Sequence, residues 1–336
     1  MARMRISDIA REAGVSPATV SRYLNNRPGA MTPETRARIA EVIERTGYRP
    51  NSAARSLRTD RTHQIGVILA DISNPFSSSM LEQLSTRAAA KGYTLMCAIT
   101  GSDPDEEARA IQNLAEAGVD ALVINTCGGN DEAIAEADAH LPVVLLDRDV
   151  EGAGLDLVTS DNATLVQALV DELARGGSEL LWLVTEADDT SSIRRERARL
   201  FGEDLRAAGL AGGTLVLDPD PERAADQVRD RTQYARPGAP IGLVAVNGLV
   251  FLRLAEAMFA AGPAVPEEAR VATFDDYVWN HILFGGVTTA AQDTQAMADA
   301  VLERVCARVD QTDADERPEP LRLELPGTLI VRASTR

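Results

Sequence analysis

Two short helices joined by a tight turn are predicted near the start of the chain by ISDIAREAGVSPATVSRYL, residues 6–24. Apolar side chains recur at helical spacing in the first half of this stretch, and Gly14 ends that helix. Ser16 can cap the second helix, with Pro17 at its first position, where a missing backbone N–H costs nothing. This arrangement is typical of domains that present their second helix to the major groove of DNA.

A third helix and a polar connection follow this pair. Thr32 opens a helix with an apolar stripe, and Gly47 stops it. We therefore expect residues 1–49 to form an all-α helix-turn-helix domain. Residues 50–58 are capable of forming a helix that is too short to be stable alone in water, and we assign residues 50–62 as the connection.

The charge distribution favours DNA as the partner of this domain. The 336-residue chain has a formal net charge of −17, yet residues 1–62 hold 12 arginines against 6 acidic residues. The remainder holds 22 basic and 45 acidic residues. This asymmetry indicates a small basic module on a large acidic body. The alternative, a three-helix module that binds another protein, leaves the arginines unexplained.

From residue 65 onward, short apolar runs alternate with amphipathic helices. This pattern is typical of doubly wound parallel sheets covered on both faces, and its length exceeds one lobe. We place the N-lobe at about 63–161 and 291–319, and the C-lobe at about 162–290 and 320–336. The predicted strands are 65–70, 94–99, 121–125, 143–147, 179–184, 214–218, 241–247, 270–274, 321–325 and 328–332. The predicted helices include 78–91, 104–117, 163–175, 194–208, 221–233, 249–261 and 293–309.

Several classes of protein are disfavoured by what the sequence lacks. No stretch approaches the ~18–20 apolar residues of a membrane helix, and no apolar export signal begins the chain, so we expect a cytoplasmic protein. Cys97, Cys127 and Cys306 are widely spaced, which disfavours disulfides and a zinc site, and we expect all three to be buried. Without a nucleophile, phosphate-loop or metal motif, we predict no enzyme activity, catalytic residue, cofactor or metal.

Polar residues follow many of the predicted strands. Because ligands of open α/β sheets bind outside the carboxyl ends of the strands, these residues indicate a binding site. Strand ends also reach the surface, where polar residues belong in any case, but the whole set converging on one cleft favours a ligand. The residues are Asp71, Ser73, Asn74, Asn125, Asp147, Arg148, Glu186, Asn247, Asp275 and Asp276. A transporter's solute-binding protein would explain this body but not residues 1–58.

Four segments together resemble the lactose/galactose repressor (LacI-type) family. They are ISDIAREAGVSPATVSRYLNN (6–26), TRARIAEVIERTGYRPNSAARSL (35–57), IGVILADISNPF (65–76) and VTTAAQD (287–293). The resemblance implies a two-lobed body of the periplasmic-binding-protein type (type I). It also implies a transcriptional regulator, by default a repressor, whose operator affinity is controlled allosterically by a small effector between the lobes. The implied partners are double-stranded DNA with a palindromic operator, the effector and a second copy of the chain in a homodimer.

The resemblance assigns DNA contacts to the second helix and to the connection. Pro17, Ala18 and Arg22 face base edges, and Arg22 grips a guanine for ~1–3 kcal/mol of discrimination. Pro17 and Ala18 replace a polar pair of some relatives. Leu57 matches a leucine that enters the minor groove from a hinge helix at 51–58; its alternative is a packing role in the linker. The other implied contacts are Ser16, Thr19, Ser21, Asn25, Tyr48, Ala54 and Arg55.

The resemblance also carries an effector pocket onto the strand ends. Phe76 and Trp279 stack on a sugar face, with core packing as the alternative for both. Arginines at 148, 194, 195 and 197 suggest a cationic cleft, so the effector is a sugar, a sugar acid or a sugar phosphate, with an anionic one as our hypothesis. Gly248 departs from the family, which commonly carries Asp there. The implied pocket residues are Asn74, Phe76, Asp147, Arg148, Arg197, Asn247, Asp275, Trp279 and Gln292.

The apolar stripe of helix 78–91, which includes Met80, Leu84 and Ala88, is a candidate dimer contact of the N-lobe. The alternative is that the stripe packs only on its own sheet. Because no heptad tail follows the last predicted strand, we expect a dimer rather than a tetramer built on such a tail.

Overall fold

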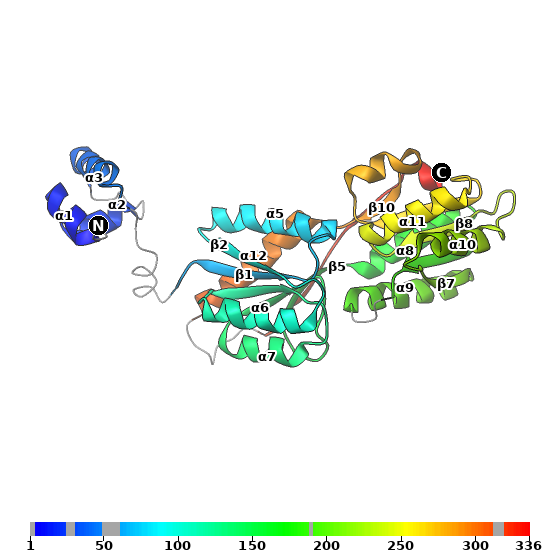
Figure 1. The fold of residues 1–336 in the computed structure, drawn as a ribbon, viewed down its shortest axis with the longest axis horizontal. Helices are drawn as coiled ribbons and strands as arrows, with labels where there is room; N and C mark the ends of the chain where they lie inside the picture. Colours follow the sequence, from blue (N-terminus) through cyan, green and yellow to red (C-terminus); the bar gives the residue numbers. More distant parts are fainter. Residues whose placement is uncertain (1–3, 25–30, 49–60, 188–190, 312–318) are drawn as a thin grey trace. The chain divides into compact units, whose positions relative to one another are not determined.

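The computed structural model falls into two compact units, Met1–Thr62, which we call the head, and His63–Arg336, which we call the body (Figure 1). We describe each unit by itself. The residues described are 4–24, 31–48, 61–187, 191–311 and 319–336. Most of the predicted connection, 50–62, therefore lies outside them.

The described part of the head consists of the helices α1 (Ile6–Ala13), α2 (Pro17–Leu24) and α3 (Pro33–Thr46), as the sequence predicts. Gly14 ends α1 at φ 66°, a left-handed conformation that glycine adopts readily, so the chain turns sharply into α2. Thr32 caps α3 by accepting a hydrogen bond from the backbone N–H of Thr35. A small core joins the three helices: Ile9, Ala10, Ala13, Val20, Ile39 and Val42.

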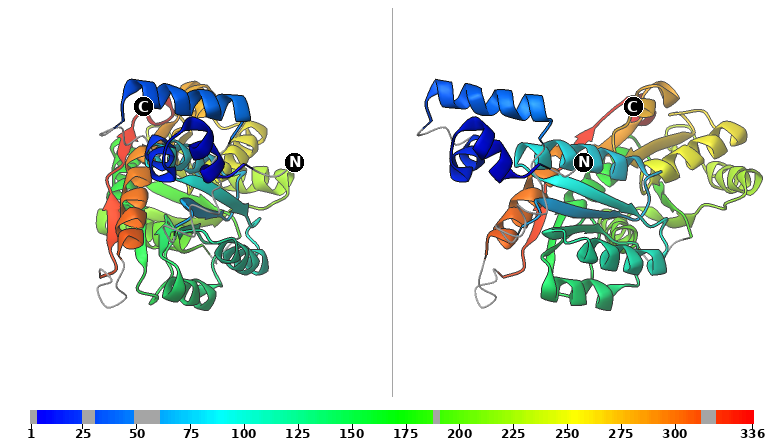
Figure 2. Two further views of the ribbon diagram at one scale, coloured as in Figure 1. Left: turned by 90° about the vertical axis from the view of Figure 1, so that its left-hand side faces the viewer. Right: turned by 60° about the vertical axis from the view of Figure 1, so that its left-hand side comes forward.

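The first lobe of the body is a parallel sheet with the strand order β11-β5-β4-β3-β1-β2. Helices α5 and α12 share a core with one face, and α6 and α7 pack on the other, as Figures 1 and 2 show. The strands are β1 (Gln64–Leu69), β2 (Thr94–Ile99), β3 (Ala121–Asn125), β4 (Val143–Leu146), β5 (Asp156–Ser160) and β11 (Arg322–Leu325). The helices are α5 (Pro75–Ala90), α6 (Pro104–Glu116), α7 (Asp131–His140) and α12 (Thr294–Asp310).

The second lobe repeats this arrangement with the order β12-β10-β9-β8-β6-β7. The short edge strand β12 runs antiparallel to β10, and the other strands pair in parallel. The strands are β6 (Leu180–Thr185), β7 (Ala211–Val216), β8 (Ile241–Ala245), β9 (Ala269–Phe274), β10 (Thr288–Ala291) and β12 (Thr328–Ile330). The helices are α8 (Asn162–Arg175), α9 (Ser192–Ala208), α10 (Pro221–Thr232), α11 (Gly248–Ala261) and the short 3₁₀ segments η1 (Val278–His281), η2 (Leu283–Gly285) and η4 (Ala333–Thr335).

The fold class predicted from the sequence is confirmed, but one lobe assignment is wrong. We expected residues 320–336 in the second lobe, whereas β11 pairs in parallel with β5 of the first sheet. The backbone N–H of Leu321 donates to the buried Asp156 carboxylate (2.8 Å), which draws the start of β11 to this edge. The last crossing between lobes therefore follows β11.

Two further expectations concern burial. Met80, Leu84 and Ala88 of α5 are fully buried in a core shared with α12, so these three side chains pack within their own lobe. Cys127 is buried, but Cys97 is exposed and Cys306 is only partly buried, contrary to the expectation that all three cysteines are buried. Within the described ranges, no helix combines the length and apolarity that a bilayer crossing needs.

Candidate nucleic-acid interface and ligand cleft

The exposed surface of α2 carries the residues predicted to meet base edges. Pro17, Ala18 and Arg22 are all exposed, while Val20 is fully buried in the head core. Burial of Val20 fixes which side of α2 faces the core, and Ala18 and Arg22 lie on the side away from it. The hydroxyl of Ser16 accepts from the backbone N–H of Thr19 (3.2 Å), so it caps α2.

The other predicted DNA contacts divide into two groups. Thr19 and Ser21 are partly buried on α2, and Tyr48 is partly buried against the head core. The remaining predicted residues lie outside the described part of the chain: Asn25, Ala54, Arg55 and Leu57.

In the body, eight of the nine residues predicted for a ligand line one cavity, which we call the cleft cavity. They come from both lobes, and most stand just after a strand or in the first turns of the following helix. The cavity is narrow, with about 20 Å³ of free volume. The eight residues are Asn74, Phe76, Asp147, Arg148, Arg197, Asn247, Asp275 and Gln292.

Arg197 is the most constrained of these side chains. It is 3% exposed, stacks over the ring of Phe274 (3.8 Å from Cζ to the ring centroid), and donates from Nε to Asn162 Oδ1 (2.9 Å). Nη1 donates to the carbonyl oxygen of Val246 (2.8 Å), while Nη2 meets no hydrogen-bond partner within the described structure. Burial lowers the pKa of the guanidinium, against the opposing effect of Asp147. A buried cationic donor is thus left for a ligand.

Asp147 and Asp275 occupy equivalent places, directly after β4 and β9. Both have positive φ, 65° and 68°, which is uncommon for residues other than glycine and typical of functional sites. Burial raises the pKa of Asp147 to about 6, with Arg197 and Arg148 opposing that rise. Burial also raises the pKa of Asp275. Among described atoms, Asp147 Oδ1 has no hydrogen-bond partner, so it offers an acceptor beside the Arg197 donor.

Gln292 links the two lobes at this cavity. Its Nε2 donates to Asp275 Oδ1 (2.6 Å), and its Oε1 accepts from the hydroxyl of Ser160 at the end of β5 (2.7 Å). Arg148 Nη1 donates to the carbonyl oxygen of Thr126 (2.9 Å), which holds it against the first lobe. These bonds fix the polar groups before any ligand arrives.

Two helices begin at the cavity. Asn74 caps α5 by accepting from the N–H of Phe76 (3.1 Å), and Asn247 caps α11 by accepting from the N–H of Val250 (2.8 Å). The N-terminus of a helix carries partial positive charge, so both caps add to the attraction for an anion.

Of the nine implied pocket residues, Trp279 is the one that the structure does not bring to the cavity lining. The lining also lacks five of the strand-end residues, Asp71, Ser73, Asn125, Glu186 and Asp276. The Trp279 side chain is packed elsewhere. Its ring packs on Tyr277 (5.0 Å between centroids) and against the second-lobe core, which is the packing alternative. Phe76 lines the cavity and is also buried in the first-lobe core. Arg194, one of the arginines that suggested a cationic cleft, lines the cavity too. Ile193 and Val246 also line it, although sequence reasoning assigned neither of them to the pocket.

Tyr277 explains the glycine at position 248. A Cβ on Gly248 would lie 2.6 Å from Cε2 of the Tyr277 ring, a distance at which something must move. The ring therefore occupies the space that a side chain at 248 would need. The backbone N–H of Gly248 also hydrogen-bonds Asp275. The sequence showed that Gly248 departs from the family pattern, but it did not indicate that Tyr277 occupies the space left by the missing side chain.

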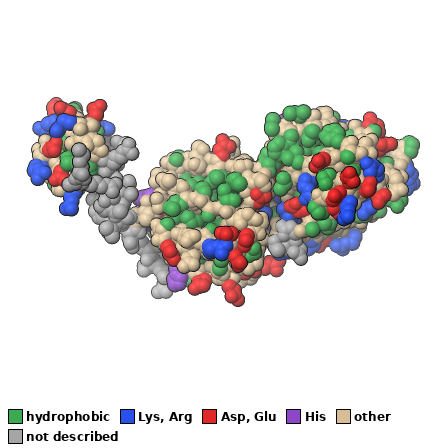
Figure 3. All heavy atoms as spheres, in the orientation of Figure 1, with side chains coloured by type: hydrophobic (Ala, Val, Ile, Leu, Met, Phe, Trp, Pro, Cys, Tyr) green, Lys and Arg blue, Asp and Glu red, His purple; other side chains and the backbone are tan. Residues whose placement is uncertain are grey.

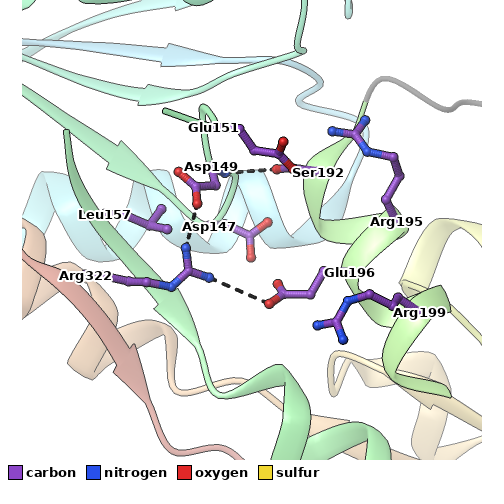
Figure 4. Close-up of a pocket in the computed structure, with 9 residues that line it drawn as sticks. All are labelled: Asp147, Asp149, Glu151, Leu157, Ser192, Arg195, Glu196, Arg199 and Arg322. Carbon is purple, nitrogen blue, oxygen red and sulfur yellow. Dashed lines mark hydrogen bonds and ion pairs between the residues drawn. The ribbon is translucent and has the colours of Figure 1, made fainter. Parts of the chain in front are cut away.

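A second, wider cavity of about 280 Å³ adjoins the first, with Asp147 in both linings. We call it the rim cavity; Figure 4 shows the Asp147 carboxylate directed into it. Arg322 of β11 was not predicted as a site residue. The lining residues are Asp147, Asp149, Glu151, Leu157, Ser192, Arg195, Glu196, Arg199 and Arg322.

Head and body together define a class of protein: a small helix-turn-helix domain joined to a two-lobed α/β body with polar groups gathered in a cleft. The sequence matches the family described as "Bacterial regulatory proteins, lacI family" over residues 5–51. It matches "Periplasmic binding proteins and sugar binding domain of LacI family" over residues 62–319. The chain therefore belongs to the LacI family of bacterial regulatory proteins.

Named relatives span nearly the whole chain. The HTH-type transcriptional regulator PtxS of Pseudomonas plecoglossicida is 34% identical over 334 residues, covering 99% of this chain and 96% of its own. The HTH-type transcriptional regulator KdgR of Bacillus subtilis is 30% identical, with 98% and 97% covered. The structure of the Lac repressor dimer bound to operator and the anti-inducer ONPF shares the fold, with a TM-score of 0.82 at 19% identity and 99% of both chains covered.

Proposed function

We propose that the protein is a transcriptional repressor that binds a palindromic operator as a homodimer, and that a small anionic carbohydrate in the cleft cavity sets its operator affinity. One observation carries the effector part: a buried cationic donor, Arg197 Nη2, and a buried acceptor, Asp147 Oδ1, line one cavity and have no partner in the described residues. Buried polar groups in folded proteins are normally paired, so an unpaired donor and acceptor in one cavity support a ligand.

The chemistry of these groups favours a hydroxy acid over a neutral sugar. A carboxylate or phosphate accepts paired hydrogen bonds from a guanidinium, and a hydroxyl donates to Asp147. The pKa values of Asp147 and Asp275 are both raised by burial, so each carboxylate takes up a proton more readily than usual. Each proton taken up removes a negative charge that offsets the positive charges of Arg148 and Arg197. An anionic ligand then restores the charge balance. The sugar, sugar acid and sugar phosphate classes are all test ligands.

Control of DNA affinity requires that the ligand favour one arrangement of the lobes over another. The cleft cavity has about 20 Å³ of free volume, whereas ligand pockets commonly measure ~300–1,000 Å³. We propose that a sugar acid is accommodated by separation of the lobes around it. Such a separation would couple ligand binding to the relative position of the two lobes.

Dimerisation is proposed through a surface of the second lobe. Val278, Ile282 and Phe259 are 72%, 71% and 62% exposed, and Phe259 stacks on Phe284 (4.9 Å). Figure 3 shows hydrophobic side chains gathered on this part of the second lobe. Because the body is strongly acidic, two copies attract each other best over an uncharged surface, and we call these four residues the apolar face.

We infer binding without turnover. The relatives are named as transcriptional regulators, and the family match over residues 5–51 is to a regulatory domain rather than to an enzyme. Recovery of a bound ligand unchanged after prolonged incubation is the expected result. Conversion of the ligand would contradict this inference.

The experiment for the whole proposal combines operator selection with a ligand panel. Full-length protein selects sites from random duplexes, and the expected product is a palindrome with half-sites about one helical turn apart. Melting shifts with glucose, gluconate and a hexose phosphate then rank the effector classes; a ligand at 100 times its Kd adds ~2.7 kcal/mol of stability. A truncated protein lacking residues 1–58 should keep the melting shift and lose site preference.

A further inference from the structure

Arg322 joins both lobes at the edge of the rim cavity. From β11 in the first sheet, Nη1 pairs with Asp149 Oδ2 (2.6 Å), and Nη2 lies 3.6 Å from Glu196 Oε1 on α9 of the second lobe (Figure 4). The backbone N–H of Asp149 donates to the hydroxyl of Ser192 on the same helix (2.9 Å). Two contacts between lobes thus lie side by side.

The same network reaches the cleft cavity. Asn162 Nδ2 lies within 3.4 Å of Glu196 Oε2, and Asn162 Oδ1 accepts from Nε of Arg197 (2.9 Å). A continuous series of polar contacts therefore runs from Arg322 through Glu196 and Asn162 to Arg197. Asn162 is only 3% exposed, so its amide has little freedom to turn away from either neighbour.

The position of Arg322 is fixed by the backbone around it. It lies opposite Leu157 in the β11–β5 pairing, and its Nε also pairs with Glu324 on its own strand (2.8 Å). A guanidinium held by a strand and shared among three carboxylates differs from a lone surface ion pair, which contributes little. Burial raises the pKa of Glu196, and Arg322 is the leading group that opposes this rise.

We propose that Arg322 is a positioning residue of the ligand cleft: by compensating Glu196 it holds α9 against the first lobe and, through Asn162, sets the Arg197 guanidinium that meets the effector. This inference rests on the proposed function for its link to the effector. The contact between lobes stands independently of any ligand, and the experiment separates the two parts.

The first measurement is hydrogen exchange of the full-length protein without ligand, followed by mass spectrometry of the peptide that contains Asp149. R322M should speed exchange there about threefold, because the Asp149 N–H is protected by Ser192 only while the lobes stay together. R322K should retain most of the protection. The matched control is R109M, because the exposed Arg109 pairs with Glu106 within α6 and touches neither lobe contact.

Rescue distinguishes positioning from mere stability. In R322M the Glu196 carboxylate loses its main compensating charge, so adding E196Q should return exchange at Asp149 toward the wild-type rate. Unchanged exchange in R322M, equal acceleration in R109M, or no rescue by E196Q would each overturn the proposal.

The second measurement is the affinity for gluconate, with glucose and a hexose phosphate as further probes. R322M should weaken binding of whichever probe the wild type binds, and E196Q should restore part of it. Exchange that changes as expected while probe affinity stays constant overturns the link to Arg197. If none of the three probes binds the wild type, the proposed function fails at the effector, and the exchange result still decides whether Arg322 holds the lobes together.

Discussion

At the scale of single residues, the cleft gathers groups that oppose stability. Asp147 is buried, has positive φ and leaves one carboxylate oxygen unpaired within the described structure. Arg197 is buried with one unpaired nitrogen, again judged on the described residues. An unsatisfied buried polar group costs ~1–3 kcal/mol, more when charged. Such costs persist at sites selected for binding rather than for stability.

Replacing Asp147 with Asn should therefore stabilise the fold above neutral pH. The pKa of Asp147 is raised to about 6, so the folded state binds the proton more tightly than the unfolded state does. The stability that this tighter proton binding contributes is present in full below the unfolded pKa of about 4, and it is lost as pH rises through about 6. D147N should exceed wild type by about 2–3 kcal/mol at pH 7.5 in urea unfolding, and the two should converge near pH 4. D230N, at an exposed site on α10, is the control. A less stable D147N at pH 7.5 contradicts this assignment.

Replacing Gly248 with Ala tests the contact with Tyr277. The new Cβ would meet the ring at 2.6 Å, so the ring must shift. We expect a loss of ~1–3 kcal/mol in urea unfolding, as for other overpacked sites. The double variant G248A/Y277A should lose less than the sum of the single variants, because the clash is absent. Strict additivity would show that the two residues do not share this space.

At the scale of elements, the sequence predicted the ends of helices and strands better than it predicted strands that lack a long apolar run. Thr32 and Gly14 marked their helix boundaries as observed. The strand β5 was missed because it begins with Asp156, a charged residue made tolerable by Arg304 (2.7 Å) and Arg308 (2.9 Å), both distant in sequence. The helix α7 was missed because Ile134 is its one fully buried side chain in an alanine-rich stretch. The short strand β10, TTAA, lacks a long apolar run.

The cleft was predictable because parallel strands place their carboxyl ends together. Polar residues after β4, β8 and β9 consequently meet, whichever helices intervene. Trp279 was harder to place, since it lies on η1, where the direction of a side chain depends on the local turn. Arg322 depended on the edge that β11 joins, which a burial pattern of alternating exposed and half-buried residues does not specify.

The element α2 yields a direct prediction for DNA recognition. R22A should reduce the preference for the selected operator over a site changed at one base pair by ~1–3 kcal/mol, because Arg22 is exposed on the free surface of α2. R11A is the matched control, an exposed arginine on α1 paired with Asp8 (2.9 Å). Competition binding with single-base-pair variants measures both. Equal loss on every sequence would assign Arg22 to the phosphate backbone instead.

At the scale of the whole molecule, charge and apolar surface are divided between parts. Basic residues exceed acidic ones in 1–62, and acidic ones dominate the rest, so the body disfavours non-specific adhesion to DNA. We expect one head to make few base contacts, so that two copies are needed to read a palindrome. The apolar face of the second lobe is where we expect the copies to meet.

Charging the apolar face should separate the dimer. I282R, with Ile282 71% exposed, should leave the fold intact and shift the protein to monomer in sedimentation. Operator affinity should fall at least tenfold, while affinity for a single half-site is unchanged. V216R on β7, where Val216 is 47% exposed outside this face, serves as control. A dimer that survives I282R would place the interface elsewhere.

The central claim is that one molecule binds operator through the head and an anionic carbohydrate through the cleft, and that the two events are coupled. Titrating operator affinity against gluconate and a hexose phosphate, for wild type and R197M, measures that coupling. The account predicts that an anionic ligand changes wild-type operator affinity at least fivefold, in the range of typical allosteric coupling, and leaves R197M unchanged. Ligand binding that leaves operator affinity the same, or an equal response in R197M, would contradict it.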